Sequence, residues 1–508
     1  MPEQTLILRS EAGIKRDGTK FDGNFYVDGQ WVRFQRGLPR KIGGYRSINK
    51  YLTEISRGFT SFTQQSLQYC HSGSADYLER FTINNTKNSS IISDRTPSTL
   101  VTSDLNMWMF NYEYDSSTTD NLLLAHVAPN LSCICNDTGG QIFSGSVTGT
   151  SALTEITLPA GANATGGIVC LHPYLFYYGT AGIVGWSVAG TPTDLTGSGS
   201  GIARVWGQKI IKGMPLRAGS GSAPAGLFWA YDAVIRGIFT GGTTVFQFDT
   251  IATDTSIMSP NAVVDYDGVF FWAGVDRFLM FNGVVREVPN QLNLNYFFDN
   301  INNAHRSKVF AFKVPHFGEI WWCYPRGDAT ECTHAVIYNV RENTWYDTAL
   351  PASGRASGGF NNGFAAPLLT DCIPTESGYR VWIHEQGVDE IDGQTAAPIP
   401  SWFETSDLSS LASGKNKALR ITTIEPDFIQ NGAMTVQVTG RSNARAPEVY
   451  SSLFTFPETA SQPYEQIVML KEQRRELRVR FESNTVNGDY QMGQIIGHIG
   501  DADGTVLS

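Results

Sequence analysis

Residues 263–289 read VVDYDGVFFWAGVDRFLMFNGVVREVP and carry the clearest structural signal in the chain. Asp267-Gly268 and Asn282-Gly283 are turn dipeptides, and Asn-Gly in particular favours a two-residue hairpin. Short runs of aromatic and branched residues lie beside these turns, at 269–273, 278–281 and 284–288. Runs of this kind, bounded by turn residues, predict buried strands. We therefore expect three antiparallel strands joined by tight turns in this stretch.

The same rhythm of short strands and turns recurs along the middle of the chain. A second clear unit spans 308–351, and looser units occupy 58–97, 121–149, 168–195, 227–250 and 379–393. Repeats of about 30 to 50 residues that hold several strands are typical of β-propellers. We predict an all-β fold with a propeller of about six or seven blades. An ordinary β-sandwich with long loops is the alternative. The best helix candidate, 290–303, is expected to be a short connector between blades.

The character of the sequence changes after about Pro398. Along 476–482, Leu477, Val479 and Phe481 alternate with arginines. This period of two indicates a strand with one buried face and one solvent-exposed face. We interpret residues 396–508 as a small antiparallel β-sandwich, or platform domain. The expected organisation is an N-terminal docking segment at 1–50, the propeller at 51–395 and the platform at 396–508.

The composition excludes several classes of protein. Of 508 residues, 41% are apolar and 17% are charged, which argues against disorder. The net charge of −10 argues against tight nucleic-acid binding, which needs clustered Lys and Arg. Seven cysteines in a chain of this length do not form a disulfide framework, and we expect reduced thiols, Cys133 and Cys135 included. No apolar run approaches the length of a membrane span, so no integral membrane segment is expected.

The residue patterns of common enzymes are missing. His384-Glu385 begins like a zinc-protease helix, but Val388 stands where the second His is needed. Asp265, Asp267 and Asp276 lie close together in sequence, yet they fall in expected turns, where Asp serves the backbone. We therefore predict no enzyme activity, no catalytic residue, no metal site and no cofactor. A propeller with two carboxylates in its central mouth could still hydrolyse glycosides, and this alternative stays open.

Basic residues form two clusters near the two ends of the chain. One functional interpretation is a docking surface for an acidic partner or for DNA, and a solvated strand face is the simpler alternative. The candidate docking residues are Arg33, Arg36, Arg40, Lys41, Arg474, Arg475 and Arg478. Both clusters would suit an arrangement in which the terminal segments pack together as one platform.

Four stretches, in this order, resemble the tail nozzle, or tail-hub, proteins of short-tailed bacteriophages (podoviruses), some of which are labelled packaged-DNA stabilisation proteins. The first comprises Gly13 to Asp17, Trp31 to Phe34 and Pro39 to Gly44. The second comprises Phe271 to Gly274 and Phe281 to Gly283. The third comprises Glu319 to Pro325, Tyr338-Asn339 and Trp345. The last comprises His384 to Asp389, Asp392-Gly393, Glu425 to Phe428 and Arg480 to Asn484. The resemblance is not carried by residues 98–260.

The resemblance implies a structural virion protein that is assembled in the host cytoplasm. Six subunits would form a ring below the portal and adaptor rings, as the lower tail tube, with each subunit carrying a β-propeller and a platform domain. Its partners would be the adaptor, or head-to-tail connector, and tail fibres or spikes. The channel would stay closed to retain packaged DNA and would conduct double-stranded DNA at infection. Because a basic channel would bind DNA strongly, we expect an acidic or neutral lumen. The alternative is a propeller-fold glycan-binding protein or glycoside hydrolase.

Overall fold

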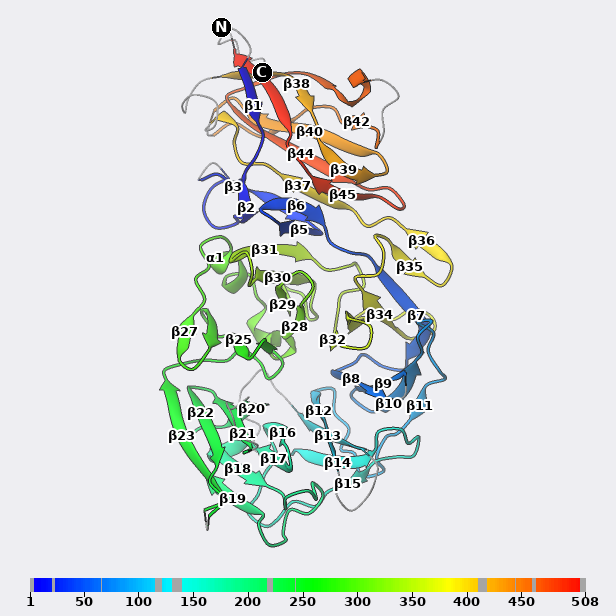
Figure 1. The fold of residues 1–508 in the computed structure, drawn as a ribbon, viewed down its shortest axis with the longest axis vertical. Coiled ribbons are helices and arrows are strands. Elements are labelled where there is room, and N and C mark those ends of the chain that lie inside the picture. The colour runs from blue at the N-terminus through cyan, green and yellow to red at the C-terminus, as the bar shows by residue number, and fades with distance from the viewer. Residues whose placement is uncertain are drawn as a thin grey trace.

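The computed structural model describes residues 4–20, 23–64, 66–114, 121–129, 139–216, 223–242, 244–409, 418–443, 445–458 and 463–502. It is a seven-bladed β-propeller with a C-terminal β-domain beside it (Figure 1). The predicted fold class is therefore confirmed, with seven blades. Cys133 and Cys135 lie outside the described residues. Cys70, Cys170, Cys323, Cys332 and Cys372 are free thiols.

Each blade is a four-stranded antiparallel unit, and the first six are built from strands consecutive in the chain. Blade 1 consists of β8 (Gly58–Gln64), β9 (Leu67–Gly73), β10 (Leu78–Ile83) and β11 (Ser93–Asp94). Blade 2 consists of β12 (Asn106–Tyr114), β13 (Asn121–Pro129), β14 (Gln141–Ser146) and β15 (Thr154–Glu155). Blade 3 consists of β16 (Gly167–Leu171), β17 (Tyr174–Tyr178), β18 (Ile183–Trp186) and β19 (Gly201–Arg204).

The next three blades repeat the same plan. Blade 4 consists of β20 (Ile210–Pro215), β21 (Ala225–Ala230), β22 (Ala233–Phe239) and β23 (Phe246–Thr253). Blade 5 consists of β24 (Val263–Tyr266), β25 (Val269–Ala273), β26 (Phe278–Phe281) and β27 (Val285–Glu287). Blade 6 consists of β28 (Phe310–Val314), β29 (Glu319–Tyr324), β30 (His334–Asn339) and β31 (Thr344–Ala349). Blade 5 contains the strands predicted from 263–289. Asn282-Gly283 lies in the turn between β26 and β27, but the loop has three residues rather than two, because Phe281 pairs with Val285.

Blade 7 closes the ring with strands from distant parts of the chain. β32 (Ser357–Asn361), β33 (Ala366–Thr370) and β34 (Tyr379–His384) pair in order, and β7 (Tyr45–Leu52) adds the fourth strand alongside β34. β35 (Glu390–Asp392) and β36 (Thr395–Ala397) extend this sheet beyond β7. Pairing the first propeller strand with the last holds the circle closed without a covalent link.

Helical structure is short and lies in connections. The expected helix at 290–303 is present but shorter, as α1 (Leu294–Phe298), and it is followed by the 3-10 segment η2 (Asn303–Lys308). The other 3-10 segments are η1 (Thr180–Gly182) and η3 (Pro463–Gln466). In the described part of the chain, no helix is long and apolar enough to cross a membrane.

The C-terminal domain is assembled from both ends of the chain. One sheet has the order β1 (Gln4–Ile7), β46 (Ile496–Asp501), β38 (Leu419–Glu425) and β43 (Val468–Arg474). A second has the order β4 (Asp28–Gln30), β37 (Ser401–Glu404), β44 (Glu476–Ser483), β40 (Met434–Arg441) and β41 (Val449–Tyr450), with β42 (Phe454–Phe456) also on β40. A third has the order β39 (Phe428–Asn431), β45 (Asp489–Met492), β6 (Leu38–Lys41) and β5 (Val32–Gln35). β2 (Glu11–Ile14) and β3 (Phe25–Tyr26) form a small parallel pair.

Residues 1–50, expected as a separate docking segment, are divided between the two domains. β1, β4 and β6 pair with C-terminal strands and β5 pairs with β6, whereas β7 belongs to blade 7 and crosses the expected boundary at residue 50. In Figure 1, the blue N-terminal strands run through the C-terminal domain before the chain enters the propeller.

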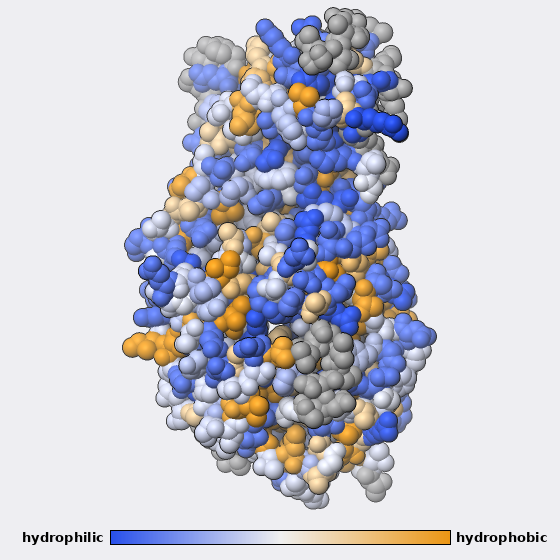
Figure 2. Space-filling model, turned by 180° about the vertical axis from the view of Figure 1, so that it is seen from behind, coloured by the Kyte–Doolittle hydropathy of each residue, from blue (hydrophilic) through white to orange (hydrophobic). Residues whose placement is uncertain are grey.

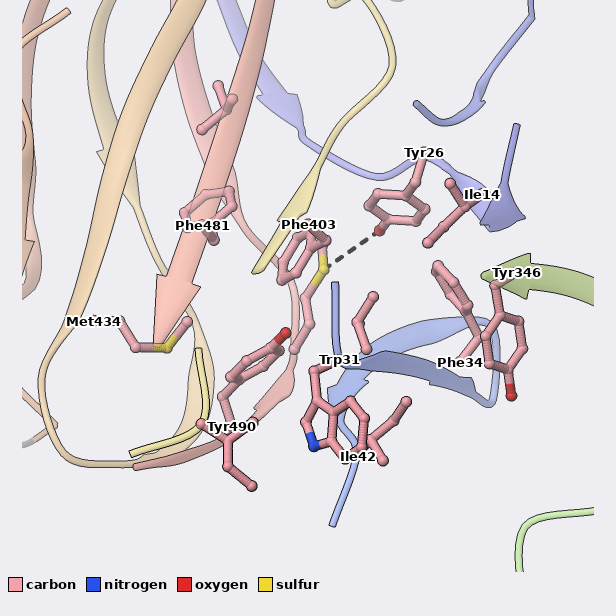
Figure 3. Close-up of a cluster of buried hydrophobic side chains, with 14 of the residues drawn as sticks. Ile14, Tyr26, Trp31, Phe34, Ile42, Tyr346, Phe403, Met434, Phe481 and Tyr490 are labelled. Carbon is pink, nitrogen blue, oxygen red and sulfur yellow. Dashed lines mark hydrogen bonds between the residues drawn. The ribbon is translucent and has the colours of Figure 1, made fainter. Parts of the chain in front are cut away.

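One hydrophobic core spans the junction of the two domains. Tyr346 of blade 6 belongs to the same buried cluster as Trp31 and Phe34 of the N-terminal segment and Phe403 and Phe481 of the C-terminal domain. Figure 3 shows these side chains together, with the Tyr26 hydroxyl bonded to the sulfur of Met492 at 3.4 Å. Because the domains share this core, their relative position is fixed by packing.

Candidate functional site

Three of the seven predicted docking residues are buried. Arg33, Lys41 and Arg478 are 1%, 2% and 1% exposed, so the prediction that they form a surface for a partner is wrong. Arg33 and Arg478 are paired with carboxylates inside this chain, and Lys41 donates to a backbone carbonyl. Of the other four, Arg36 is exposed and Arg40, Arg474 and Arg475 are partly exposed.

The two basic clusters lie on different sheets. Arg33, Arg40 and Lys41 are on β5 and β6, at the propeller end of the C-terminal domain. Arg474 ends β43, and Arg478 lies on β44 of a further sheet. The structure therefore does not bring the two clusters together as one basic surface.

Arg33 holds the N-terminal segment to two blades of the propeller. Its Nε lies 2.8 Å from Glu319 Oε1 on β29, and its Nη1 donates to Glu385 Oε2 just after β34 at 3.0 Å. The guanidinium also stacks on the Phe317 ring, 3.6 Å from its centroid. Burial alone would lower the pKa of Arg33, but Glu319 and Glu385 outweigh it and leave that pKa raised. The charged pair is therefore maintained in the buried junction.

Glu319 is held by further donors from its own blade. Trp321 Nε1 donates to Glu319 Oε2 at 2.9 Å, and the Tyr346 hydroxyl donates to Oε1 at 2.7 Å. Glu319 is fully buried. Sequence reasoning did not identify Glu319 and Glu385 as partners of Arg33. The available signal was an acidic residue directly before the apolar run Ile320-Trp321-Trp322.

A second connection joins the N-terminal segment to blade 6 and α1. Arg16 Nε donates to Asp347 Oδ1 at 2.9 Å, and its Nη1 contacts Asp28. Asp17 accepts hydrogen bonds from the backbone N–H groups of Asn295 and Tyr296, at the start of α1. Gly13 has φ +110°, and a Cβ there would lie 2.4 Å from Leu292. Close approach of this segment to the propeller therefore requires glycine.

The remaining buried cations act within the C-terminal domain. Lys41 Nζ donates to the Gly488 carbonyl at 2.6 Å, and burial lowers the pKa of this lysine. Arg478 Nε donates to Glu404 at 2.8 Å and its Nη2 donates to Glu448 at 2.6 Å. Both residues therefore stabilise the domain from inside.

Three of the four stretches that carry the family resemblance meet at this junction, and the second lies in blade 5. Arg16 and Arg33 come from the first stretch, Glu319 from the third and Glu385 from the last. The backbone of Gly44, also in the first stretch, hydrogen-bonds to Gly387 in the last at 2.8 Å. Segments that are far apart in sequence thus form one contact region between the domains.

The propeller axis holds a cavity of about 260 Å³. Its lining comes from all seven innermost strands or the residues directly beside them: 58–60, 108–111, 168–169, 212–215, 261 and 263, 310–311, and 357–358. Lys212 is the only charged residue among the described lining residues. Figure 2 shows an opening near the centre of the propeller on the face turned away in Figure 1.

The aspartates considered for hydrolase chemistry lie away from this cavity. Asp265 accepts a hydrogen bond from the backbone N–H of Gly268 at 2.8 Å, which is a turn role. Asp267 has φ +52° in the same turn, and Asp276 lies 3.5 Å from Arg277 near the surface. Among the described residues that line the axial cavity, none is a carboxylate. The paired acids that glycoside hydrolysis needs are therefore not supplied by that described lining.

The fold and the junction define a seven-bladed β-propeller whose C-terminal β-domain is built from both chain ends. No protein-family model and no curated protein matches the sequence. Among solved structures, the chain is similar to the WD40 beta propeller domain of Doa1, with 13% identity and a TM-score of 0.41 over 67% of this chain and 97% of that one. It is also similar to U3-55K, with 7% identity and a TM-score of 0.39 over 67% of this chain and 98% of that one. The similarity to the RRP9 WD40 repeats has 7% identity and a TM-score of 0.40 over 68% of this chain and 99% of that one.

Proposed function

We propose that this protein is a structural subunit of the lower tail tube, or nozzle, of a short-tailed bacteriophage. Its copies would form a ring, expected to be hexameric, that closes the channel on packaged DNA and conducts double-stranded DNA at infection. Its partners would be the adaptor, or head-to-tail connector, and tail fibres or spikes. The protein would belong to the virion after assembly in the host cytoplasm.

The convergence of three of the four resemblance stretches on the domain junction carries this proposal. Motifs scattered over the surface would not have indicated a shared structural role. The three stretches instead supply Arg33, Glu319 and Glu385, which connect the two domains through buried charges. A ring subunit that must keep a channel aligned needs such fixed domains, because a closed ring repeats one contact geometry.

The charge of the chain is compatible with a conduit. The net charge is −10, and Arg33, Lys41 and Arg478 are turned inward, away from any channel. A lumen rich in arginine and lysine would retain DNA through many phosphate contacts. We therefore keep the expectation that the ring lumen is acidic or neutral.

Electron microscopy of the purified protein, and of virions made without it, tests the proposal. We expect rings, alone or on addition of the adaptor, and virions that lack the tip of the tail and leak DNA. A protein that stays monomeric beside its phage neighbours, or mutant virions with complete and sealed tails, would refute it. Release of sugar from a glycan, or specific glycan binding, would instead favour the propeller lectin or hydrolase.

A further inference from the structure

The axial cavity combines a neutral, partly aromatic lining with a single cation. Phe59, Thr60, Phe110 and Asn261 line it together with Lys212, and its volume is about 260 Å³. Pockets for drug-sized ligands usually measure about 300–1,000 Å³, so this cavity suits a smaller molecule.

Lys212 lies on β20, beside a β-bulge. The ladder between β20 and β21 shifts by one residue between Ile210 and Lys212, and bulges redirect side chains. No hydrogen bond or ion pair joins its ammonium to any residue that the structure describes. Burial lowers the pKa of Lys212 to about 8, and no acidic group opposes that shift among the described residues. At pH 7 most copies therefore still carry the charge.

An amine that is charged, withdrawn from bulk water and without a counter-charge is unfavourable. An anion entering the cavity would supply that counter-charge. We propose that the axial cavity binds a small molecule that carries an oxyanion group, a carboxylate or a phosphate, and that Lys212 holds this group. The proposal concerns the single subunit and does not depend on the tail-tube proposal.

Calorimetric titration of the full chain with inorganic phosphate and, separately, with acetate tests the proposal. The ionic strength is held constant with chloride, and the variants are Lys212→Met and Lys471→Met. Lys471 is an exposed residue of β43, so its substitution removes the same charge outside the cavity. We expect saturable binding of one anion to the wild type and to Lys471→Met. Lys212→Met should weaken it by about thirtyfold or more, as expected for a buried charge pair.

The identity of the bound anion separates the two chemical sources, since saturation by phosphate alone indicates a phosphate ligand and saturation by acetate alone a carboxylate. As a second readout, the NMR signal of ¹³C-methylated Lys212 should titrate near pH 8 and move to higher pH with the bound anion. Equal binding by Lys212→Met, or no saturable binding of either anion, would overturn the proposal. A pKa of Lys212 that rises only on self-assembly would also overturn it, and would assign the cavity to an acidic side chain of a neighbouring subunit.

Discussion

The propeller and the C-terminal domain are both antiparallel β-structures, but their contacts span very different distances along the chain. In six blades, the paired strands follow one another directly in the chain, and only blade 7 includes a distant strand, β7. In the C-terminal domain, Gln4 pairs with Ile499 and Gln30 pairs with Trp402. The propeller can therefore form largely from local hairpins, whereas the C-terminal domain needs both chain ends at once.

The charged groups of the two regions differ in a related way. Buried ion pairs such as Arg33–Glu319 lie where the N-terminal segment crosses between the domains. Inside the propeller, the buried His126 and the half-buried Lys212 on the cavity wall have no acidic partner among the described residues. The junction thus depends on compensated charge. The propeller interior combines one compensated pair, Arg355–Asp371, with groups whose pKa values are lowered by burial. Four experiments, from the largest expected effect to the smallest, test this contrast.

Removal of residues 1–42 should affect the two domains very differently. The truncated chain keeps β7, so blade 7 can still close, but the C-terminal domain loses β1, β4, β5 and β6. We expect limited proteolysis to cleave the region after residue 398 rapidly and to leave a propeller fragment that resists digestion. Equal resistance of both regions, measured by mass spectrometry of the fragments, would show that the C-terminal domain does not depend on the N-terminal strands.

Substitution of Arg33→Met should lower the free energy of unfolding by about 3–5 kcal/mol, because it leaves Glu319 buried without its cation. Denaturant unfolding measures the change. The control is Arg474→Met, which breaks the pair with Glu472 near the surface and should cost about 0–1 kcal/mol. Losses of similar size in the two variants would contradict the distinction between the junction and the surface.

Acid should destabilise the propeller through its buried histidines. Burial lowers the pKa of His126 to about 4, so between pH 6.5 and 4 the unfolded chain binds a proton that the folded chain does not. The free energy of unfolding therefore falls over this window, by about 3 kcal/mol for a shift of this size. His126→Gln should flatten that dependence in equilibrium unfolding curves. A pH profile unchanged by the substitution would mean that other groups dominate acid unfolding.

Lys212→Met should stabilise the chain at pH 7 in the absence of added anions, by about 1–2 kcal/mol, because it removes a half-buried charge that has no partner among the described residues. The folded pKa is about 8 and the ordinary value is 10.5. Between these values the unfolded chain holds the proton and the folded chain has lost it, so wild-type stability rises with pH. The advantage of the variant should therefore shrink from pH 8 to pH 10. A destabilised variant would show that Lys212 is paired in solution.

Sequence reasoning located the blades because their signals are local. The Asn282-Gly283 turn and the aromatic run 269–273 lie within a few residues of the contacts that they determine. The alternation at 476–482 likewise predicted β44, in which Leu477, Val479 and Phe481 are buried. The opposite face was expected to be exposed, but Arg478 on that face is buried against Glu404. Residues 1–50 carried no comparable signal of their partners, because those partners lie hundreds of residues away.

The candidate site was predicted less well than the fold. The sequence showed clustered arginines, and clustering suggested a surface for a partner. Whether an arginine faces water or a buried glutamate depends on which strand packs on it. For Arg33 and Arg478, the tertiary packing places Glu319 and Glu404 beside the guanidinium groups. Lys212 gave no signal at all, because a single lysine in a strand looks the same at a wet edge and at a propeller axis.

The sequence by itself determined the local elements of this protein: turns at Gly and Asn, strands of aromatic and branched residues, and a repeat long enough to make blades. Only the tertiary structure decided the closure through β7, the platform made from both termini, the burial of Arg33 and the place of Lys212 on the cavity wall. The physical reason is range. Backbone preference and side-chain alternation act between near neighbours, whereas burial and charge pairing depend on which distant segments meet.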